Sequence, residues 1–255
     1  MKHILIFSPG ETAALDHAVK YLTDRKIQTI DHPSPDVTHL LLGAPAFDGS
    51  GRLRFGGDLE PLLSMLPDGI TVIGGNLNHP GLHGYTLWDL LKDERYLAKN
   101  AEITAHCALS LAAQLLPVTL AGCPVLVIGW GRIGKILAKL LGCIGADVTV
   151  AARRPESLAM AEALGFRAVP LNRLPQSVSG CRVILNTVPA PVLSLEQMAR
   201  CRNDCLKIDL ASVSGMAGSD VIRARGLPGK EAPESSVILI AQTVLGYLEE
   251  REEQK

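Results

Sequence analysis

The feature that most constrains this chain is a short glycine-rich turn between an apolar run and an amphipathic segment. Residues 125–128 are apolar and mostly β-branched, which predicts a buried strand, and the apolar period over 133–141 predicts a helix directly after it. Between them, Gly129, Gly131 and Gly134 have the G-x-G-x-x-G spacing of dinucleotide-binding turns. The first glycine permits the tight turn, the second lets the backbone approach a pyrophosphate, and the third lets helix and strand pack closely. The sequence therefore predicts a nucleotide-binding Rossmann unit.

The end of the next expected strand, 147–150, bears on the choice of nucleotide. NAD-binding units place an Asp or Glu about 20 residues beyond the glycines, where it binds the ribose 2′-hydroxyl. This chain has Ala152 followed by Arg153 and Arg154 instead. A planar, permanently charged guanidinium suits a 2′-phosphate. The pattern favours NADP over NAD, and the alternative is a pair of solvated surface arginines.

Polar residues also follow the later strands that we expect over 182–185 and 206–210. Because a Rossmann domain holds the nicotinamide half of its cofactor at such strand ends, Asn186, Thr187 and Ser212 are candidates for that half. The alternative is ordinary turn chemistry, for which these residue types are common. The complete set of predicted cofactor-binding residues is Gly129, Trp130, Gly131, Arg132, Ile133, Gly134, Ala152, Arg153, Arg154, Asn186, Thr187, Val188, Pro189, Asp209, Ala211 and Ser212.

The overall composition excludes several function classes. The 255 residues include 47% hydrophobic residues, enough for two domains with buried cores. A formal net charge of −1 provides no basic field for nucleic acid or an acidic membrane. The six cysteines contain no C-x-x-C pair and no complete metal-ligand set, and neither a signal peptide nor a bilayer-spanning run is recognisable. We expect a cytoplasmic protein without a bound metal.

The chain order predicts an α/β fold with two sheets. In the first hundred residues, apolar strand-like runs alternate with helical patterns, which is typical of a parallel sheet. From 85 to 117 the sequence is almost continuously helix-compatible. We predict a smaller N-terminal flavodoxin-like α/β domain over 1–98, a connecting helix over 99–117, a Rossmann domain with a parallel sheet over 118–234, and a C-terminal helix and tail over 235–255.

Five segments together point to a known family. They are G-W-G-R-I-G at 129–134, A-A-R at 151–153, N-T-V-P at 186–189, D-L-A-S at 209–212 and G-L-P-G-K-E-A-P at 226–233. From about residue 100 to 248 the chain resembles the A subunits of dipicolinate synthase from spore-forming bacteria. The resemblance implies NADP(H) as cofactor and a cyclic dicarboxylate of dihydrodipicolinate type as substrate. It also implies an oligomer whose partner is a flavoprotein B subunit, and a role in sporulation.

The chain departs from that family at two places near the expected nicotinamide end. His106 occupies the position of a family acid on the connecting helix, and the segment after Ser212 is shorter than in the family. Because histidine titrates near neutrality, His106 is our first candidate for a catalytic acid or base. Lys230, which we expect in a Gly-Pro loop, is a candidate for holding a substrate carboxylate, and His79 is a weaker catalytic candidate.

Three interpretations of function follow from these residues. The first is an NADP-dependent oxidoreductase of the dipicolinate synthase type. The second is another dehydrogenase: a shikimate-dehydrogenase-like enzyme remains open, whereas a hydroxyacid dehydrogenase is disfavoured, since Val213 stands where an arginine is needed and no histidine follows His106. The third is a non-catalytic nucleotide-binding subunit of a hetero-oligomer.

Overall fold

The computed structural model describes residues 4–9 and 13–253. The chain divides into two compact units: Met1–Asn100 with Ala232–Lys255, and Ala101–Glu231. Each unit contains one sheet in which every pairing of neighbouring strands is parallel, so the predicted α/β class is confirmed. No helix in the described part of the chain has the length and apolarity needed to cross a bilayer.

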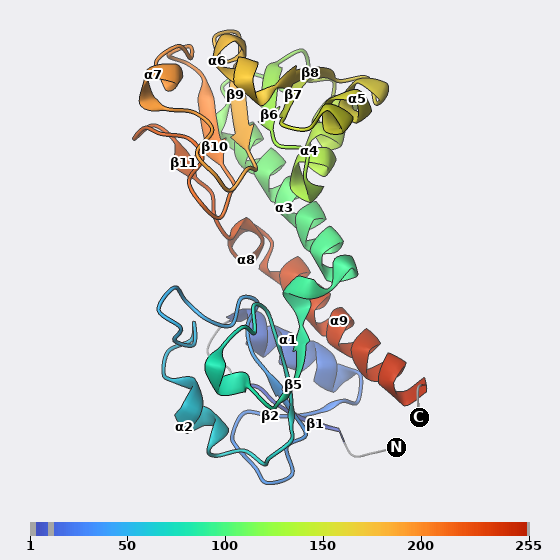
Figure 1. Cartoon of the computed structure of the whole chain (residues 1–255). Helices are drawn as coiled ribbons and strands as arrows, with labels where there is room; N and C mark the ends of the chain where they lie inside the picture. Colours follow the sequence, from blue (N-terminus) through green and yellow to red (C-terminus); the bar gives the residue numbers. More distant parts are fainter. Residues whose placement is uncertain (1–3, 10–12, 254–255) are drawn as a thin grey trace. The chain divides into compact units, whose positions relative to one another are not determined.

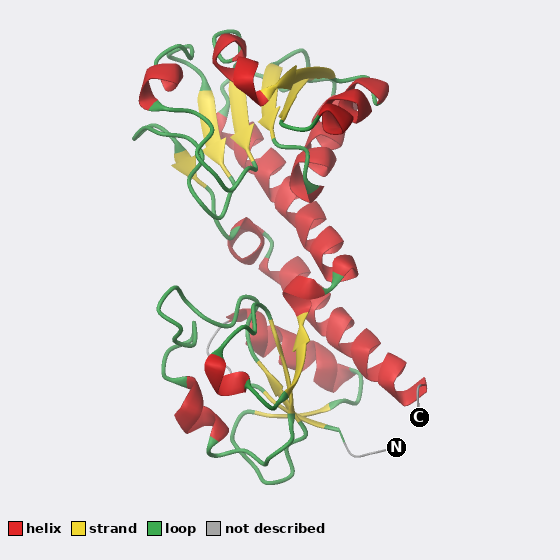
Figure 2. Cartoon of the chain, viewed as in Figure 1, coloured by secondary structure: helices red, strands yellow, loops and turns green. Residues whose placement is uncertain are grey.

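The first unit has a five-stranded sheet with the order β2-β1-β3-β4-β5. This is the flavodoxin-type order, in agreement with the prediction. An irregular loop joins β3 to α2, and short 3-10 turns flank β5 (Figure 2). The elements are β1 (Leu5–Phe7), α1 (Ala13–Asp24), β2 (Gln28–Ile30), β3 (His39–Leu41), α2 (Leu59–Leu63), β4 (Thr71–Gly74), η1 (Pro80–Leu82), β5 (Thr86–Asp89), η2 (Leu90–Lys92) and α9 (Pro233–Glu253).

The C-terminal helix α9 belongs to this first unit, although more than a hundred residues separate it from the rest in sequence. It packs along α1, and the Gln242 amide donates a hydrogen bond to the Tyr21 hydroxyl at 3.3 Å. At the sheet edge, the Trp88 and Tyr247 rings stack with centroids 4.0 Å apart. Helix α9 thus completes the first unit, although it follows the second unit in sequence (Figure 1).

The second unit has a six-stranded sheet with the order β11-β10-β9-β6-β7-β8. Counted from β6, this is the 3-2-1-4-5-6 order of a Rossmann domain. Helix α4 packs on β6 and β7, and α5 packs on β7 and β8 (Figure 1). The elements are β6 (Pro124–Ile128), α4 (Arg132–Cys143), β7 (Asp147–Ala152), α5 (Pro155–Ala163), β8 (Arg167–Pro170), η3 (Leu171–Arg173), α6 (Leu174–Ser177), β9 (Val183–Asn186), α7 (Leu195–Met198), β10 (Leu206–Asp209), β11 (Ile222–Arg223) and α8 (Leu227–Glu231).

Two local predictions were wrong. The helix-compatible stretch over 85–117 begins with strand β5, and the helix α3 (Glu94–Leu115) starts only after it. The Asp89 carboxylate accepts a hydrogen bond from the Leu91 N–H, which turns the chain into η2 and ends β5. Lys230 lies in the short helix α8 rather than in a loop. Both elements are short, so their pairing and packing outweigh the local pattern.

Candidate nucleotide-binding site

The glycine turn has the geometry that its spacing predicts. Gly129 follows β6 with φ of 107°, a conformation that favours glycine. A Cβ added at Gly134 would lie 2.1 Å from the carbonyl oxygen of Gly129, so helix and strand approach too closely for any side chain there. A Cβ added at Gly131 would meet no atom within 4 Å. The turn therefore leaves space beside its second glycine, at the N-terminus of α4, where dinucleotide-binding folds place the pyrophosphate.

The loop that follows β9 fixes the turn from the other side. Thr187 donates its backbone N–H and its hydroxyl to the carbonyl oxygen of Ile128, at 2.8 and 2.9 Å. A Cβ at Gly129 would lie 2.3 Å from Oγ1 of Thr187 and 3.0 Å from Cγ2 of Val188. The first glycine is thus required by contact with the N-T-V-P segment as well as by its backbone conformation.

The end of β7 carries the residues predicted to select the nucleotide. Ala152 is buried, and the side chains of Arg153 and Arg154 are exposed at the start of α5. Within the described residues, no hydrogen bond or ion pair engages either guanidinium. An unpaired arginine at this position is able to form charged hydrogen bonds with a phosphate.

A buried polar network joins the ends of β9 and β10. We call Asn186, Asp209 and Arg223 the aspartate network. Asp209 is 1% exposed, and its Oδ1 accepts hydrogen bonds from Asn186 Nδ2 at 2.8 Å and from the Ala211 N–H at 3.2 Å. Its Oδ2 accepts from the N–H groups of Gly215 and Met216 and, at 2.7 Å, from Nη1 of Arg223. These donors occupy the carboxylate fully, so Asp209 shapes the strand end from within the protein.

The Asn186 amide is equally engaged. Its Oδ1 accepts from the Val188 N–H at 3.0 Å, and its Nδ2 also donates to the Val188 carbonyl at 3.1 Å. Asn186 is fully buried and therefore sets the path of the chain toward Pro189. The remaining predicted positions near these strand ends differ in exposure: Ala211 is buried, whereas Pro189 and Ser212 are exposed.

Trp130 lies between the first two glycines of the turn and contacts the segment between α5 and β8. The Trp130 ring meets Phe166 edge-on, with centroids 6.0 Å apart, and its Nε1 is buried without a hydrogen-bond partner. Arg132 is exposed, and Ile133 is half-buried at the first turn of α4. Trp130 is therefore the one aromatic side chain within the G-W-G-R-I-G segment and a natural spectroscopic reporter of it.

Comparison with known proteins agrees with this geometry. No model of a known protein family matches the chain. Over 159 residues it is 29% identical to the A subunit of dipicolinate synthase from Bacillus subtilis (strain 168). The chain resembles the A subunit of dipicolinate synthase. The matched stretch covers 59% of this chain and 54% of that protein, so it spans about half the length of the curated relative.

Solved structures extend the likeness over both units. The crystal structure of the A subunit of dipicolinate synthase from Bacillus halodurans matches with a TM-score of 0.83 at 22% identity, covering 96% of this chain and 97% of that one. The transhydrogenase from Sinorhizobium meliloti matches with a TM-score of 0.70 at 15% identity, over 97% and 94% of the two chains. These likenesses show the fold, which this dipicolinate synthase-like chain shares with both solved structures.

The catalytic candidates lie on other elements of the second unit. His106 is exposed on α3 and Lys230 is exposed in α8. Burial raises the pKa of the Cys107 thiol, and the carboxylate of Glu231 raises it further, so the end of α8 lies close to α3 beside both candidates. No hydrogen bond or ion pair links His106 or Lys230 to the glycine turn in the part of the chain that is described.

His79, the weaker catalytic candidate, lies in the first unit, where its side chain bonds within its own loop. Its Nδ1 accepts the Gly81 N–H at 3.1 Å, and its ring stacks on Phe47 with centroids 4.7 Å apart. This side chain caps η1 and packs against the loop after β3. Among the described residues, no group of three or more His, Cys, Asp or Glu side chains is arranged to hold a metal ion.

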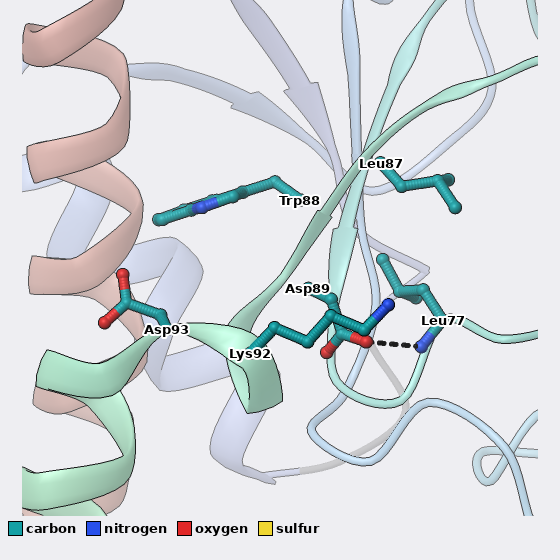
Figure 3. A pocket seen from close by; sticks show the side chains of 6 residues that line it. All are labelled: Leu77, Leu87, Trp88, Asp89, Lys92 and Asp93. Carbon is teal, nitrogen blue, oxygen red and sulfur yellow. Dashed lines mark hydrogen bonds between the residues drawn. The ribbon is translucent and has the colours of Figure 1, made fainter.

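Two pockets lie outside the glycine turn. In the first unit, a pocket of about 360 Å³ opens at the ends of β4 and β5 (Figure 3). In the second unit, a pocket of about 490 Å³ lies beside the aspartate network and includes Arg223 among mostly apolar residues. The sequence gives no sign that Arg223 belongs to this site, because a two-residue strand has no periodic pattern and its partner Asp209 is 14 residues away.

Proposed function

We propose that this chain is an NADP-dependent oxidoreductase subunit whose substrate is a cyclic dicarboxylate of dihydrodipicolinate type. The observation that carries the proposal is the strand end at Ala152, where an unpaired Arg153 stands in place of a carboxylate. The glycine turn fits a dinucleotide, since Gly131 leaves open the space that a pyrophosphate needs. Such a cofactor supplies or accepts a hydride when bound.

In this proposal the residues have separate roles. The backbone around Gly131 and the N-terminus of α4 bind the pyrophosphate, and Arg153, with Arg154 beside it, binds the 2′-phosphate. Thr187 and the backbone of residues 187–189 and 211–212 face the nicotinamide half. The similarity to the A subunit of dipicolinate synthase supports a role in dipicolinate synthesis and an assembly with a second subunit. The flavin in that second subunit and the role in sporulation are further parts of the proposal, as the family resemblance implies.

The test of cofactor choice is Arg153→Ala, measured by calorimetry with NADPH and NADH. A charged hydrogen bond contributes about 1.5–3 kcal/mol, so the variant should lose about ten- to hundredfold in NADPH affinity. NADH affinity should stay nearly unchanged. Lys139→Ala is the matched control, because it removes one exposed positive charge from α4 of the same unit. Equal affinity of the unmutated chain for both nucleotides would refute NADP selectivity.

The alternative is a nucleotide-binding subunit without chemistry of its own, which is favoured by the exposure of His106 and its lack of a bonded partner among the described residues. His106→Asn separates the two. If His106 moves a proton during hydride transfer, turnover should fall by about a hundred- to ten-thousandfold. NADPH affinity and melting temperature should hardly change, because the side chain is exposed.

The assay follows nicotinamide absorbance with candidate dicarboxylate, with and without a flavoprotein partner. His83→Asn is the control, since it changes another exposed histidine in the first unit. Unchanged turnover in His106→Asn would remove this residue from the chemistry. A parent chain without turnover under both conditions would favour the binding-subunit function.

A further inference from the structure

Arg223 is a charged residue to which neither a motif nor a comparison gives a role. It lies on β11, the edge strand of the second sheet. Its Nη1 donates to Asp209 at 2.7 Å and its Nη2 donates to the Met216 carbonyl at 2.5 Å, while the side chain is 37% exposed. Arg223 therefore carries the positive charge that neutralises an almost completely buried carboxylate.

A continuous chain of contacts leads from Arg223 to the glycine turn. Asp209 accepts hydrogen bonds from both Arg223 and Asn186. Asn186 in turn bonds to the N–H and the carbonyl of Val188. Thr187, next to Val188, donates two hydrogen bonds to the carbonyl of Ile128, directly before Gly129, and a Cβ added at Gly129 would come within 2.3 Å of Thr187 and 3.0 Å of Val188. Each link is a hydrogen bond or a close contact, so a change at Arg223 reaches the turn without touching it.

The second loop depends on the same carboxylate. Asp209 accepts the N–H groups of Ala211, Gly215 and Met216, and thereby holds both ends of the loop after β10. Gly215 is packed so tightly that an added Cβ would lie 2.3 Å from Nδ2 of Asn186. The two loops are thus fastened to one buried negative charge.

We propose that Arg223 is a positioning residue for the dinucleotide: by neutralising Asp209 it holds loops 187–193 and 210–217, and through them the glycine turn. This inference rests on the proposed nucleotide-binding function. An isolated buried carboxylate is strongly unfavourable. Without the guanidinium, Asp209 should draw in water and release the backbone N–H groups that it now accepts. The guanidinium acts on the protein rather than on the dinucleotide, because its Nη1 and Nη2 are already bonded to Asp209 and to the Met216 carbonyl.

The first test needs no nucleotide. Hydrogen exchange of the purified chain is compared among the parent, Arg223→Met and the control Arg225→Met. Arg225 is exposed two residues away and has no bonded partner among the described residues. We expect amide exchange in 187–193 and 210–217 to become at least tenfold faster in Arg223→Met and to stay at the parental rate in Arg225→Met. Parental rates in both variants, or an equal acceleration over the whole second unit, would overturn the proposal.

The second test separates the halves of the nucleotide. NADPH contacts both the turn and the strand-end loops, whereas adenosine 2′,5′-bisphosphate lacks the nicotinamide half. In Arg223→Met we expect NADPH affinity to fall at least tenfold and affinity for the fragment, which reaches the glycine turn but not the loops, to fall by a clearly smaller factor. An equal loss for both ligands, or no loss for either, would contradict a positioning role at the loops.

Charge balance provides a rescue. The double variant Asp209→Asn with Arg223→Met removes both charges of the aspartate network, so we expect slower loop exchange and tighter NADPH binding than in Arg223→Met alone. Arg223→Lys retains the charge and should lie between parent and Arg223→Met, which keeps the test available if Arg223→Met fails to fold. A double variant no better than Arg223→Met would refute the charge argument. If the parent binds neither ligand, the nucleotide function fails, and Arg223 positions no dinucleotide; the exchange test then decides only whether it holds the loops.

Discussion

Each of the two sheets carries an aspartate at the end of a strand, and the two are satisfied differently. Asp89 is the last residue of β5 and accepts the N–H groups of Asn76, Leu77 and Leu91 at 2.9, 3.1 and 2.9 Å. Figure 3 shows the bond to Leu77. It is half-buried beside a pocket. No lysine or arginine among the described residues forms an ion pair with it. Three N–H donors suffice there, since water reaches the remaining lone pairs.

Asp209 likewise accepts three backbone N–H groups, yet it is nearly inaccessible and is paired with Arg223. Backbone N–H donors are therefore enough to bind a carboxylate at a strand end, whereas a completely buried carboxylate also needs a counter-charge. A half-buried aspartate tolerates the loss of one donor. Loss of the buried Asp209 is instead expected to release both loops that it holds.

Replacing each aspartate by alanine tests this difference most directly. Asp209→Ala leaves Arg223 and several N–H groups without their acceptor and should cost about 4 kcal/mol in unfolding free energy. Asp89→Ala should cost about 1 kcal/mol, because water can replace a half-buried acceptor. Each unit contains one of the two tryptophans, Trp88 or Trp130, so urea unfolding followed in Trp88→Phe and Trp130→Phe backgrounds reports each unit separately. Equal losses at the two sites would invalidate the comparison.

The glycine turn after β6, an interior strand of the second sheet, offers a second, smaller contrast. Gly134→Ala places a methyl group 2.1 Å from the Gly129 carbonyl and should cost about 2 kcal/mol through overpacking. Gly131→Val adds bulk where no protein atom lies within 4 Å, so stability should change by about 0.5 kcal/mol at most. NADPH binding should nevertheless disappear in Gly131→Val, as measured by energy transfer from Trp130. Normal binding by a stable Gly131→Val variant would move the pyrophosphate elsewhere.

A pH-dependent effect is expected at the ion pair between Asp220 and Lys207, which lies two residues before Asp209 on β10. Burial lowers the pKa of Lys207, but its hydrogen bond and attraction to Asp220 outweigh burial and raise it above 10.5. The same bond holds the pKa of Asp220 below 3.8. The Asp220 contribution is present above pH 3.8 and is lost as pH falls through its lowered pKa. The Lys207 contribution is present below pH 10.5 and is lost as pH rises through its raised pKa.

Asp220→Asn should therefore be less stable than the parent by about 1 kcal/mol between these limits, because Asp220 is largely exposed and the interaction is screened. The difference should shrink in acid and again in strong base. Urea midpoints between pH 3 and pH 9 test the acid side. A deficit that stays constant as the pH approaches 3 would show that the charge of Asp220 is irrelevant.

Local patterns predicted the parts of this molecule that local geometry determines. The spacing of Gly129, Gly131 and Gly134 specified a turn that the structure contains, and alternating strands and helices specified two parallel sheets. Strand β5 was missed because it is an exposed edge strand without apolar alternation, paired only with β4. Strand β5 forms because it pairs with β4, and that pairing is not visible in the local sequence pattern.

The site shows the same division. Arg153 is visible in sequence because it directly follows a strand. The pairing of Arg223 with Asp209 arises only when β11 pairs with β10, and the burial that makes it matter is a property of the folded sheet. Asp209 and Asn186 were predicted as positions at the cofactor, while their dense internal bonding favours a role in shaping the loops.

The discontinuity of the first unit has a consequence for how the chain is made. Helix α1 is synthesised before α9, which packs along it, and the whole second unit lies between them in sequence. At about 5–20 residues per second, the intervening chain delays α9 by roughly 10–40 s. The second unit is contiguous and can fold during that interval, whereas α1 waits with its apolar face uncovered. The second unit should therefore fold before the first is complete, and a stall before residue 233 should leave a folded second unit attached to an unfinished first unit that binds chaperones.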